Sequence, residues 1–430
     1  MDPIKDIPNE ILKEINELEM FVINKEKLID IVDKFAQQLE KGLSKQGGTI
    51  PMFPTWVLGY ANGNEQGIYL ALDIGGTNFR LCKVNLCGER KFDVIQSNYT
   101  ISPELKRSDS DIFFGFIAKC LKDFLKEHDI KEEITLGFTF SYPCRQDRID
   151  HGVLKHWTKE FNVKNVEGYD VVEILRKAIE KENISVKVAA IVNDTTGTLI
   201  ASNYVDSTTE VGVIFGTGSN AAYMEQVKYI PKIEHLNLPP NLPIAINCEW
   251  GSFDNEHLVL PRTKYDIQLD LESRSPGQQT FEKMVSGSYL GEILRQILLD
   301  LCEKNLFFKE QCLKILFKTH FNIECTIFER KIIKKITKLI TNRSAYLSAC
   351  GIAAICKKKN IKECSVGVDG SIINKYPGFK KQVCDALVYI YEPYGDKIKL
   401  INAQDGSGVG AAIIAALTTE RKKRGEFIHI

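Results

Sequence analysis

The hydrophobic pattern of the chain alternates between short strand-like runs and longer helical periodicities. Apolar residues recur at the spacing of an amphipathic helix over residues 25–45, and a Gly-Gly pair at 47–48 ends that pattern. Strand-like runs then follow at 68–72, 80–84, 92–99, 134–140 and 186–192, with helical patterns at 112–124 and 171–181. This order predicts a first unit of the α/β class.

A second series of the same kind begins at residue 211. Strand-like runs lie at 211–215, 221–224, 364–368 and 398–401, and helical patterns lie at 278–304, 331–358, 378–391 and from Ser407 onward. Each unit contains a strand, a Gly/Thr turn and a second strand, at residues 73–78 and 215–220. The two series predict two α/β lobes around a cleft, each with a hairpin that can bind phosphate.

The amino-acid composition of the chain argues against two classes of function, nucleic-acid binding and disordered regulation. The 430 residues include 56 Lys and Arg against 56 Asp and Glu, and 44% of the residues are hydrophobic. A nucleic-acid-binding protein normally has a basic excess, and a disordered regulator has a high net charge with few apolar residues. The sequence therefore predicts a globular protein of two or three domains that does not bind nucleic acid.

The distribution of apolar and cysteine residues gives a prediction for location. The N-terminus has no apolar core of a signal segment, and the apolar stretch at 409–417 is too short to span a bilayer. The 12 cysteines contain no Cys-x-x-Cys pair, which makes a structural zinc site improbable and favours reduced thiols. We expect a cytoplasmic protein without a membrane segment.

Two basic clusters, at 357–359 and 421–424, lie near predicted helix ends. Basic residues in the last turn of a helix interact favourably with its dipole, which is the simpler interpretation. Nuclear targeting is the alternative.

The segment Asp73-Ile-Gly-Gly-Thr-Asn-Phe-Arg80 follows directly on a buried strand. Gly75 and Gly76 lack Cβ atoms, so that successive N–H groups can face an anion, and Arg80 adds a charged fork. Asp73 can hold a hydrated Mg²⁺ at the strand end. The alternative is an ordinary tight hairpin with a salt-bridging arginine.

A second motif, Asn193-Asp194-Thr195, also ends a buried strand. A carboxylate placed there, in a cleft between lobes, can accept a proton from a substrate hydroxyl while Asn193 binds the same ligand. Taken alone, the motif is more typical of a turn or a helix cap.

Two further carboxylates, Glu249 and Glu282, lie in polar, glycine-rich surroundings. Carboxylates beside a planar residue such as Trp250 suit the recognition of sugar hydroxyls. Taken alone, Glu282 would more often lie on a solvated helix face.

Together these motifs resemble the eukaryotic hexokinase family, and they occur in the order of that family. The resemblance rests on Leu-Ala-Leu-Asp-Ile-Gly-Gly-Thr-Asn-Phe-Arg at 70–80, Leu-Gly-Phe-Thr-Phe-Ser-Tyr-Pro at 136–143, Trp-Thr-Lys at 157–159, Val-Asn-Asp-Thr at 192–195, Phe-Gly-Thr-Gly at 215–218, Glu-Trp-Gly-Ser-Phe-Asp-Asn-Glu-His at 249–257, Pro-Gly-Gln-Gln at 276–279 and Val-Asp-Gly-Ser at 368–371. It covers nearly the whole chain.

The resemblance implies the two-lobed, actin-like ATPase (ribonuclease-H-like) fold. It implies a segment at 1–59 packed on the large lobe, a small lobe at 60–195 completed by about 419–430, and a large lobe at 196–418. The implied sugar-binding residues are Ser141, Pro143, Thr158, Lys159, Asn193, Asp194, Asn220, Glu249 and Glu282. The implied nucleotide-binding residues are Asp73, Gly75, Gly76, Thr77, Asn78, Arg80, Gly216, Thr217, Gly218, Asp369, Gly370, Ser371 and Ser407.

The implied reaction is transfer of the γ-phosphoryl of ATP-Mg²⁺ to the 6-hydroxyl of a hexose by a monomer or homodimer. Asp194 would be the catalytic base, with Lys159 and Arg80 adding positive charge. A catalytically weak hexose sensor and a sugar-independent ATPase are the alternatives. The chain departs from the family at Glu160, where glycine is usual, and at Cys248, where threonine is usual. Cys248 and Cys144 are interpreted as packing residues or, alternatively, as a sugar-protected, oxidation-sensitive site.

Overall fold

Two main β-sheets organise the protein, and strands distant in the sequence meet in each of them. The computed structural model describes residues 18–158, 161–307 and 326–426. The first sheet has the strand order β4–β3–β2–β5–β8, and β2, β3 and β4 are antiparallel whereas β2, β5 and β8 are parallel. Its strands are β2 (Gln66–Ile74), β3 (Asn78–Gly88), β4 (Lys91–Thr100), β5 (Ile134–Phe140) and β8 (Val186–Val192).

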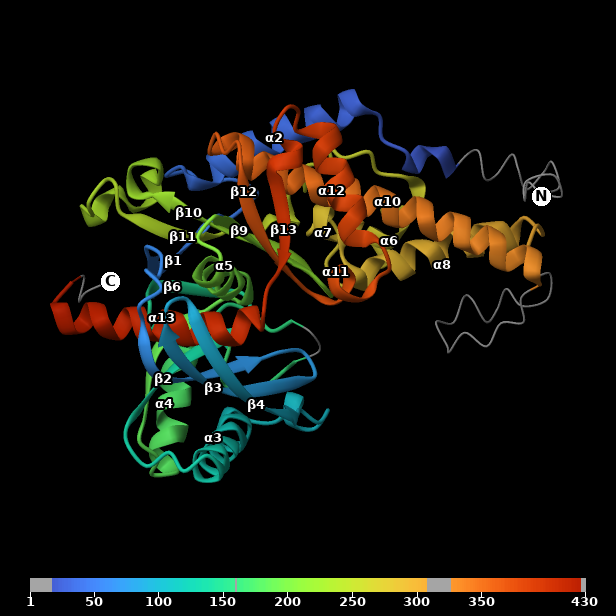
Figure 1. Ribbon diagram of the computed structural model, residues 1–430. Coiled ribbons are helices and arrows are strands. Elements are labelled where there is room, and N and C mark those ends of the chain that lie inside the picture. The colour runs from blue at the N-terminus through green and yellow to red at the C-terminus, as the bar shows by residue number, and fades with distance from the viewer. Residues whose placement is uncertain (1–17, 159–160, 308–325, 427–430) are drawn as a thin grey trace.

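Helices cover both faces of the first sheet (Figure 1). Helices α3 (Ser110–Glu127) and α4 (Val171–Lys181) share one apolar core with alternate residues of β2 and β5, such as Leu72 and Phe138. The intervening residues of β2 face the opposite way and join a second core, because side chains alternate along a strand. Helix α13 (Gly406–Arg424) covers that second face.

The second sheet has six strands in the order β1–β11–β10–β9–β12–β13. The strands are β1 (Phe53–Leu58), β9 (Thr209–Phe215), β10 (Ser219–Gln226), β11 (Pro243–Asn247), β12 (Cys364–Asp369) and β13 (Ile398–Asn402). Strands β9, β12 and β13 are parallel, and β9, β10 and β11 form an antiparallel meander. A small hairpin of β6 (Cys144–Arg148) and β7 (His151–Leu154) lies outside both sheets.

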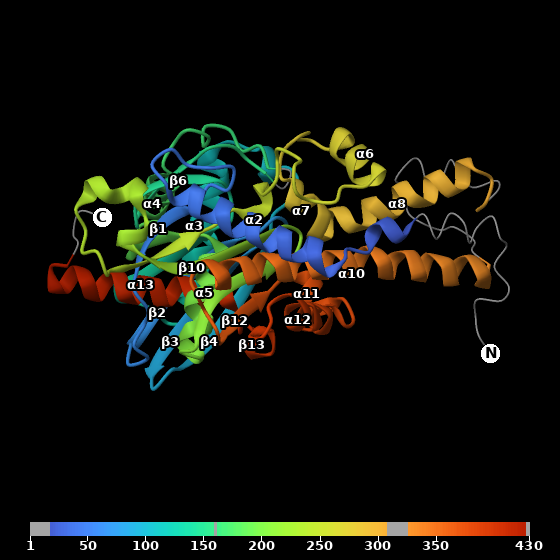
Figure 2. The same cartoon turned by 90° about the horizontal axis from the view of Figure 1, so that it is seen from above.

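The remaining helices form a layer around the second sheet. They are α2 (Lys25–Leu43), α6 (Lys264–Glu272), α7 (Thr280–Val285), α8 (Gly287–Glu303), α10 (Ile327–Lys358), α11 (Ser371–Lys375) and α12 (Phe379–Ile390). The long helix α10 runs beside α2, as Figure 2 shows. Phe35 of α2 packs face to face with Phe253, with ring centroids 4.0 Å apart, and thereby anchors the N-terminal helix on this layer.

Helix α5 (Asp194–Val205) packs against α13 between the two sheets (Figure 1). The helices cross at two glycines, since a Cβ atom on Gly410 would lie 2.0 Å from the carbonyl oxygen of Gly197. Only glycine allows this close approach of the backbones. The crossing fixes the position of the N-terminal ends of both helices.

The predicted helices and strands are confirmed with small changes of their bounds, except in one region. The pattern at 278–304 predicted one helix, and this prediction is wrong. The structure has α7 and α8, separated at Ser286. The N–H group of Gly287 donates to the carbonyl of Gly216 (2.9 Å) instead of continuing the helix of α7.

The boundary at which the chain re-enters the small lobe remains a proposal, and the packing of α13 changes its position. The predicted boundary is at about residue 419. Helix α13 begins at Gly406 and contacts β2, β5 and β8. We propose Gly406 as the point of return, because the helix packs as one unit.

The lysine cluster at 357–359 pairs with carboxylates of the same molecule. Lys357 contacts Asp33 of α2, and Lys358 contacts Glu225 of β10. These pairs support the interpretation of the cluster as a helix end. No helix in the described part of the chain is long and apolar enough to cross a membrane.

Candidate active site

The turn between β2 and β3 has the tight form that its glycines predicted. The N–H of Gly75 donates to the carbonyl of Asn78 (3.0 Å), and Thr77 and Asn78 are exposed. The hydroxyl of Tyr142 donates to the carbonyl of Gly75 (3.0 Å). This bond attaches the segment containing Ser141 and Pro143 to the β2–β3 hairpin.

Arg80 connects the hairpin to the N-terminal end of α13. Its Nη1 donates to Oδ1 of Asp405 (2.6 Å), and its Nη2 donates to Oδ2 of Asp73 (2.6 Å) and to Oγ of Ser407 (2.7 Å). Burial alone would lower the pKa of Arg80, but the two carboxylates raise it above its ordinary value. The guanidinium is therefore a fixed positive charge at this point.

Asp73 fits the prediction of a water-mediated Mg²⁺ contact. Its Oδ2 accepts from Ser407 (2.7 Å) as well as from Arg80, whereas no described residue donates to its Oδ1. No cluster of three or more His, Cys, Asp or Glu side chains that could hold a metal occurs in the described ranges. One carboxylate suffices for a Mg²⁺ that arrives bound to the phosphates of a nucleotide, because such an ion keeps several waters.

Asp194 is the first residue of α5, directly after β8. Asn193 caps the helix by accepting from the N–H of Thr195 (2.9 Å), which confirms the cap interpretation. Oδ1 of Asp194 accepts from the same N–H (2.9 Å), and Oδ2 accepts nothing from the residues that the structure describes. Asp194 therefore lies at the N-terminal end of a helix, with one of its oxygens bound to the helix backbone.

The crossing of α5 and α13 at Gly197 and Gly410 places α5 beside the arginine cluster. This cluster consists of Arg80, Asp73, Asp405 and Ser407. A Cβ atom on Gly197 would lie 3.1 Å from Cα of Ser407, and Thr139 donates to the carbonyl of Ser407 (2.9 Å). The helix that begins with Asp194 therefore packs directly on the residue that contacts Arg80 and Asp73. The sequence analysis predicted these residues separately, and the fold brings their segments together.

A second polar cluster lies at the ends of β10 and β11. Nδ2 of Asn247 donates to Oε1 of Glu249 (2.8 Å), and Nδ2 of Asn220 donates to Oδ1 of Asn247 (2.6 Å). The N–H of Glu249 donates back to Oδ1 of Asn220 (2.9 Å). These bonds hold a carboxylate and two amides in one arrangement that can bind several hydroxyls.

Glu282 of α7 faces the second hairpin. Its Oε2 accepts from the N–H of Ser219 (2.9 Å). The same oxygen lies 2.7 Å from the position that a Cβ atom added to Gly218 would occupy. Trp250, the planar residue beside Glu249, is fully buried and not exposed beside the carboxylates, and its Nε1 donates to Oγ of Ser219 (3.0 Å). Trp250 instead supports the hairpin from the core.

The second hairpin turn, Gly216–Gly218, closes by a bond from the N–H of Gly216 to the carbonyl of Gly218 (2.9 Å). Thr217 at its tip is exposed. Gly370 packs on the strand before this turn, at φ 116°, and a Cβ there would lie 2.5 Å from the carbonyl carbon of Phe215. Asp369 and Ser371 are thereby brought next to the hairpin, and their role in binding a nucleotide stays a prediction.

The segment that carries Thr158 is attached to the Ser141 segment by aromatic packing. Trp157 stacks on Phe161 (centroids 5.3 Å apart) and meets Tyr142 edge to face (4.9 Å). Lys159 and Glu160, which the sequence analysis singled out, lie outside the described residues.

The two thiols of interest are buried or half-buried. Cys248 is fully buried, and burial raises the pKa of its thiol well above the ordinary range. Burial raises the pKa of Cys144 to about 12. Both values support packing over redox sensitivity. Nine described cysteines are free, but Cys302 is disulfide-bonded, so the expectation of reduced thiols fails there.

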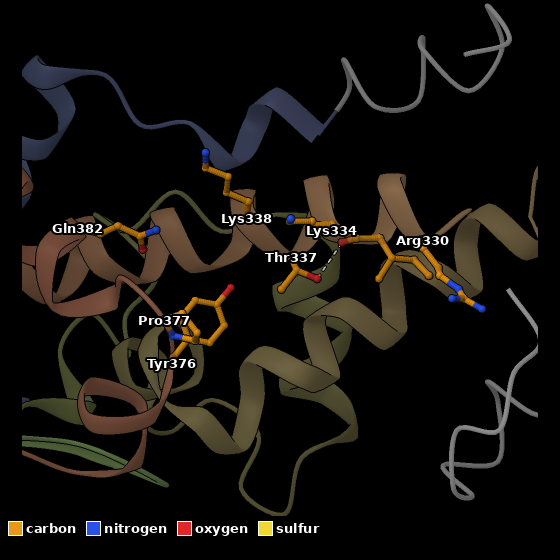
Figure 3. A pocket seen from close by; sticks show the side chains of 8 residues that line it. Arg330, Lys334, Thr337, Lys338, Tyr376, Pro377 and Gln382 are labelled. Atoms are coloured by element: carbon orange, nitrogen blue, oxygen red, sulfur yellow. Dashed lines mark hydrogen bonds between the residues drawn. The ribbon is translucent and has the colours of Figure 1, made fainter. Parts of the chain in front are cut away.

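A cavity of about 500 Å³ lies apart from these clusters, between α10 and the segment from α11 to α12 (Figure 3). Arg330, Lys334 and Lys338 of α10 lie on one side, and Tyr376 and Pro377 lie on the other. The sequence analysis predicted no site residue there, and the cavity contains none of the carboxylates described above.

Three residues of the site were missed by the sequence analysis: Tyr142, Asn247 and Asp405. Tyr142 lay within a quoted motif and Asn247 lies two residues before another, but neither carried an expectation of its own. Asp405 precedes α13, and its partner Arg80 is 325 residues away. No local signal could have paired them.

The protein has the two-lobed, actin-like ATPase fold, with two sheets and a hairpin in each. The carboxylates beside the hairpins indicate an enzyme. Hexokinase family models match residues 13–204 and, in two overlapping pieces, residues 210–327 and 310–417. The chain belongs to the hexokinase family.

Individual relatives agree over nearly the full length. The hexokinase of Kluyveromyces lactis is 47% identical over 99% of this chain and 96% of its own, and hexokinase-1 of Saccharomyces cerevisiae is 45% identical with the same coverage. The structure of hexokinase from Schistosoma mansoni complexed with glucose has a TM-score of 0.85 at 34% identity, covering 94% of this chain and 98% of that chain. Hexokinase activity follows from this membership.

Proposed function

We propose that the enzyme transfers the γ-phosphoryl of Mg-ATP to the 6-hydroxyl of a hexose, with Asp194 as the catalytic base. The arrangement around Asp194 carries the proposal. One of its oxygens is held by the α5 backbone, and no described residue donates to the other. Its helix packs on Ser407, which belongs to the arginine cluster.

The base acts by accepting the proton of the hydroxyl as that oxygen attacks phosphorus. The bond from the N–H of Thr195 to Oδ1 holds the carboxylate of Asp194 in place. Arg80 and the N–H groups of the first hairpin stabilise the charge on the phosphoryl oxygens. Asp73 would hold one of the waters of the Mg²⁺ that accompanies ATP, and that ion would neutralise phosphate charge.

The sugar is proposed to bind at the Asn220–Asn247–Glu249 cluster and at Glu282, with Ser141, Thr158 and Asn193 on the opposite side. Glucose is the first candidate, because the structurally similar Schistosoma mansoni hexokinase is described as a complex with glucose. Glu249 is already oriented by Asn247, so binding needs little reordering of the site.

A coupled assay for ADP release with glucose, fructose, mannose or no sugar tests this function. We expect turnover only when a hexose is present, since the sugar supplies the attacking oxygen. ATP turnover without sugar would contradict the proposal and support an ATPase. Sugar binding without turnover would support the hexose sensor. A cytoplasmic location and a monomer or homodimer remain predictions from the sequence.

A further inference from the structure

Lys283 directly follows Glu282, the carboxylate that is proposed to bind the sugar. Its charged side chain is buried. Its residue is only 4% exposed. Adjacent side chains on a helix point about 100° apart, so Glu282 and Lys283 face different parts of the molecule. Glu282 faces the second hairpin, whereas Lys283 points into the layer formed by α6 and α7.

The ammonium of Lys283 has two fixed acceptors. It donates to Oδ1 of Asp270 (2.6 Å) and to the carbonyl of Ser275 (2.7 Å). Asp270 also accepts from the N–H of Gly277 (3.1 Å). The pair therefore connects α6, the loop at 273–279 and α7.

The same loop ends at Gln279, the residue before α7. Gln279 has a φ angle of 56°, and its Oε1 lies 2.3 Å from the position that a Cβ atom added to Gly251 would occupy. The Cβ atom of Glu282 lies 3.0 Å from the same position. Residues from both ends of the first α7 turn thus pack against the segment that follows Glu249.

Helix α7 has only six residues, too few to be stable without tertiary contacts. Its orientation must come from contacts such as the Lys283 ion pair. The void beside the pair has a volume of about 10 Å³. This is at the lower limit for one water, so solvent cannot easily replace the ammonium.

We propose that the buried Lys283–Asp270 ion pair orients Glu282 toward the sugar, which makes Lys283 a positioning residue of the sugar site. The inference rests on the proposed role of Glu282 as a sugar ligand. It predicts that loss of the ammonium weakens sugar binding selectively, because α7 and the preceding loop then lose their shared contact. The nucleotide residues on α13 and the first hairpin do not contact this pair.

Lys283→Met is the informative variant. Methionine keeps the length of the side chain, and Asp270 retains Arg262 at 3.5 Å and the Gly277 N–H. A buried carboxylate is therefore not left without a partner, so the variant is expected to fold. Lys358→Met is the matched control, because Lys358 forms a similarly buried pair with Glu225 in the same lobe.

The experiment measures glucose affinity by calorimetry and the KM for ATP in wild type, Glu282→Ala, Lys283→Met, the double variant and the control. We expect Lys283→Met to raise the glucose Kd by about tenfold or more, with the KM for ATP within about twofold. In the Glu282→Ala background the same change should alter the glucose Kd by less than about twofold, since the residue acts through Glu282.

Three results would overturn the inference. They are an unchanged glucose Kd in Lys283→Met, effects that multiply in the double variant, and an equal weakening in Lys358→Met. An unchanged glucose Kd in Glu282→Ala is a different failure, because it would contradict the proposed sugar role of Glu282 itself.

Discussion

Arg80 illustrates how much of the site depends on one side-chain geometry. The planar fork contacts Asp405 through Nη1 and both Asp73 and Ser407 through Nη2. An ammonium has the same charge but cannot span these partners from one fixed plane. The position therefore requires arginine, and a positive charge alone does not suffice.

Arg80→Lys should consequently lower kcat/KM for ATP by about a hundredfold, which is the usual scale for loss of an oriented charge in a phosphoryl-transfer site. Glucose affinity should stay near the wild-type value, because the sugar cluster does not contact Arg80. Steady-state kinetics with varied ATP, together with glucose titration, measures both quantities. Wild-type kcat/KM for ATP would contradict the proposed role.

The sequence predicted some site residues well because their signals are local. Asp73 and Asp194 each follow a buried apolar strand, a pattern that places a carboxylate at a sheet edge. Asp405 and Asn247 act through partners that only the fold brings near. The burial of Trp250 has no local signal, because its sequence neighbours suggest a polar site while its ring joins the core.

At the scale of elements, the crossing of α5 and α13 determines where Asp194 lies. Gly197 and Gly410 leave no room for a side chain between the helices. This explains the run of small residues in the Ala-rich helix from Ser407 onward. The run allows close packing against α5 and the first sheet.

Gly410→Ala should lower the free energy of unfolding by about 1–3 kcal/mol, because the added methyl would overlap the Gly197 carbonyl. It should also lower kcat by displacing the helix that carries Asp194. Urea unfolding and the coupled assay measure the two effects. Gly115→Ala in α3 is the control, since nothing lies within 4 Å of its added Cβ. Equal stability of both variants would contradict the crossing.

Element prediction succeeded where periodicity was long and failed where tertiary contacts decide. Strands β1 and β11 were not predicted, because both are short and contain or begin with proline. The break between α7 and α8 was missed because the apolar pattern continues through it. The bond from Gly287 to Gly216 that interrupts the helix joins residues 71 positions apart, so the pattern contains no trace of it.

At the scale of the whole molecule, the proposed sugar and phosphate residues belong to two sheets. Asp73 and Arg80 lie on the first sheet, and Asn220 lies on the second. A ligand that contacts both groups therefore favours approach of the lobes, which excludes water from the reacting phosphoryl group.

Glucose alone should reduce the radius of gyration measured by small-angle X-ray scattering, and a sugar that is not a substrate should not. The formally neutral chain lowers long-range repulsion, so the scattering should be insensitive to moderate salt. An unchanged radius at saturating glucose would contradict closure on sugar binding.

The proposed removal of the sugar hydroxyl proton by Asp194 is tested most directly by Asp194→Asn. The amide retains the shape of the side chain and an oxygen that can accept from the N–H of Thr195, but it cannot accept the proton. We predict a loss of kcat of at least about a hundredfold, within the usual contribution of a general base, while calorimetry finds the glucose Kd within about tenfold of wild type. A kcat near the wild-type value in a variant that binds glucose normally would contradict the account.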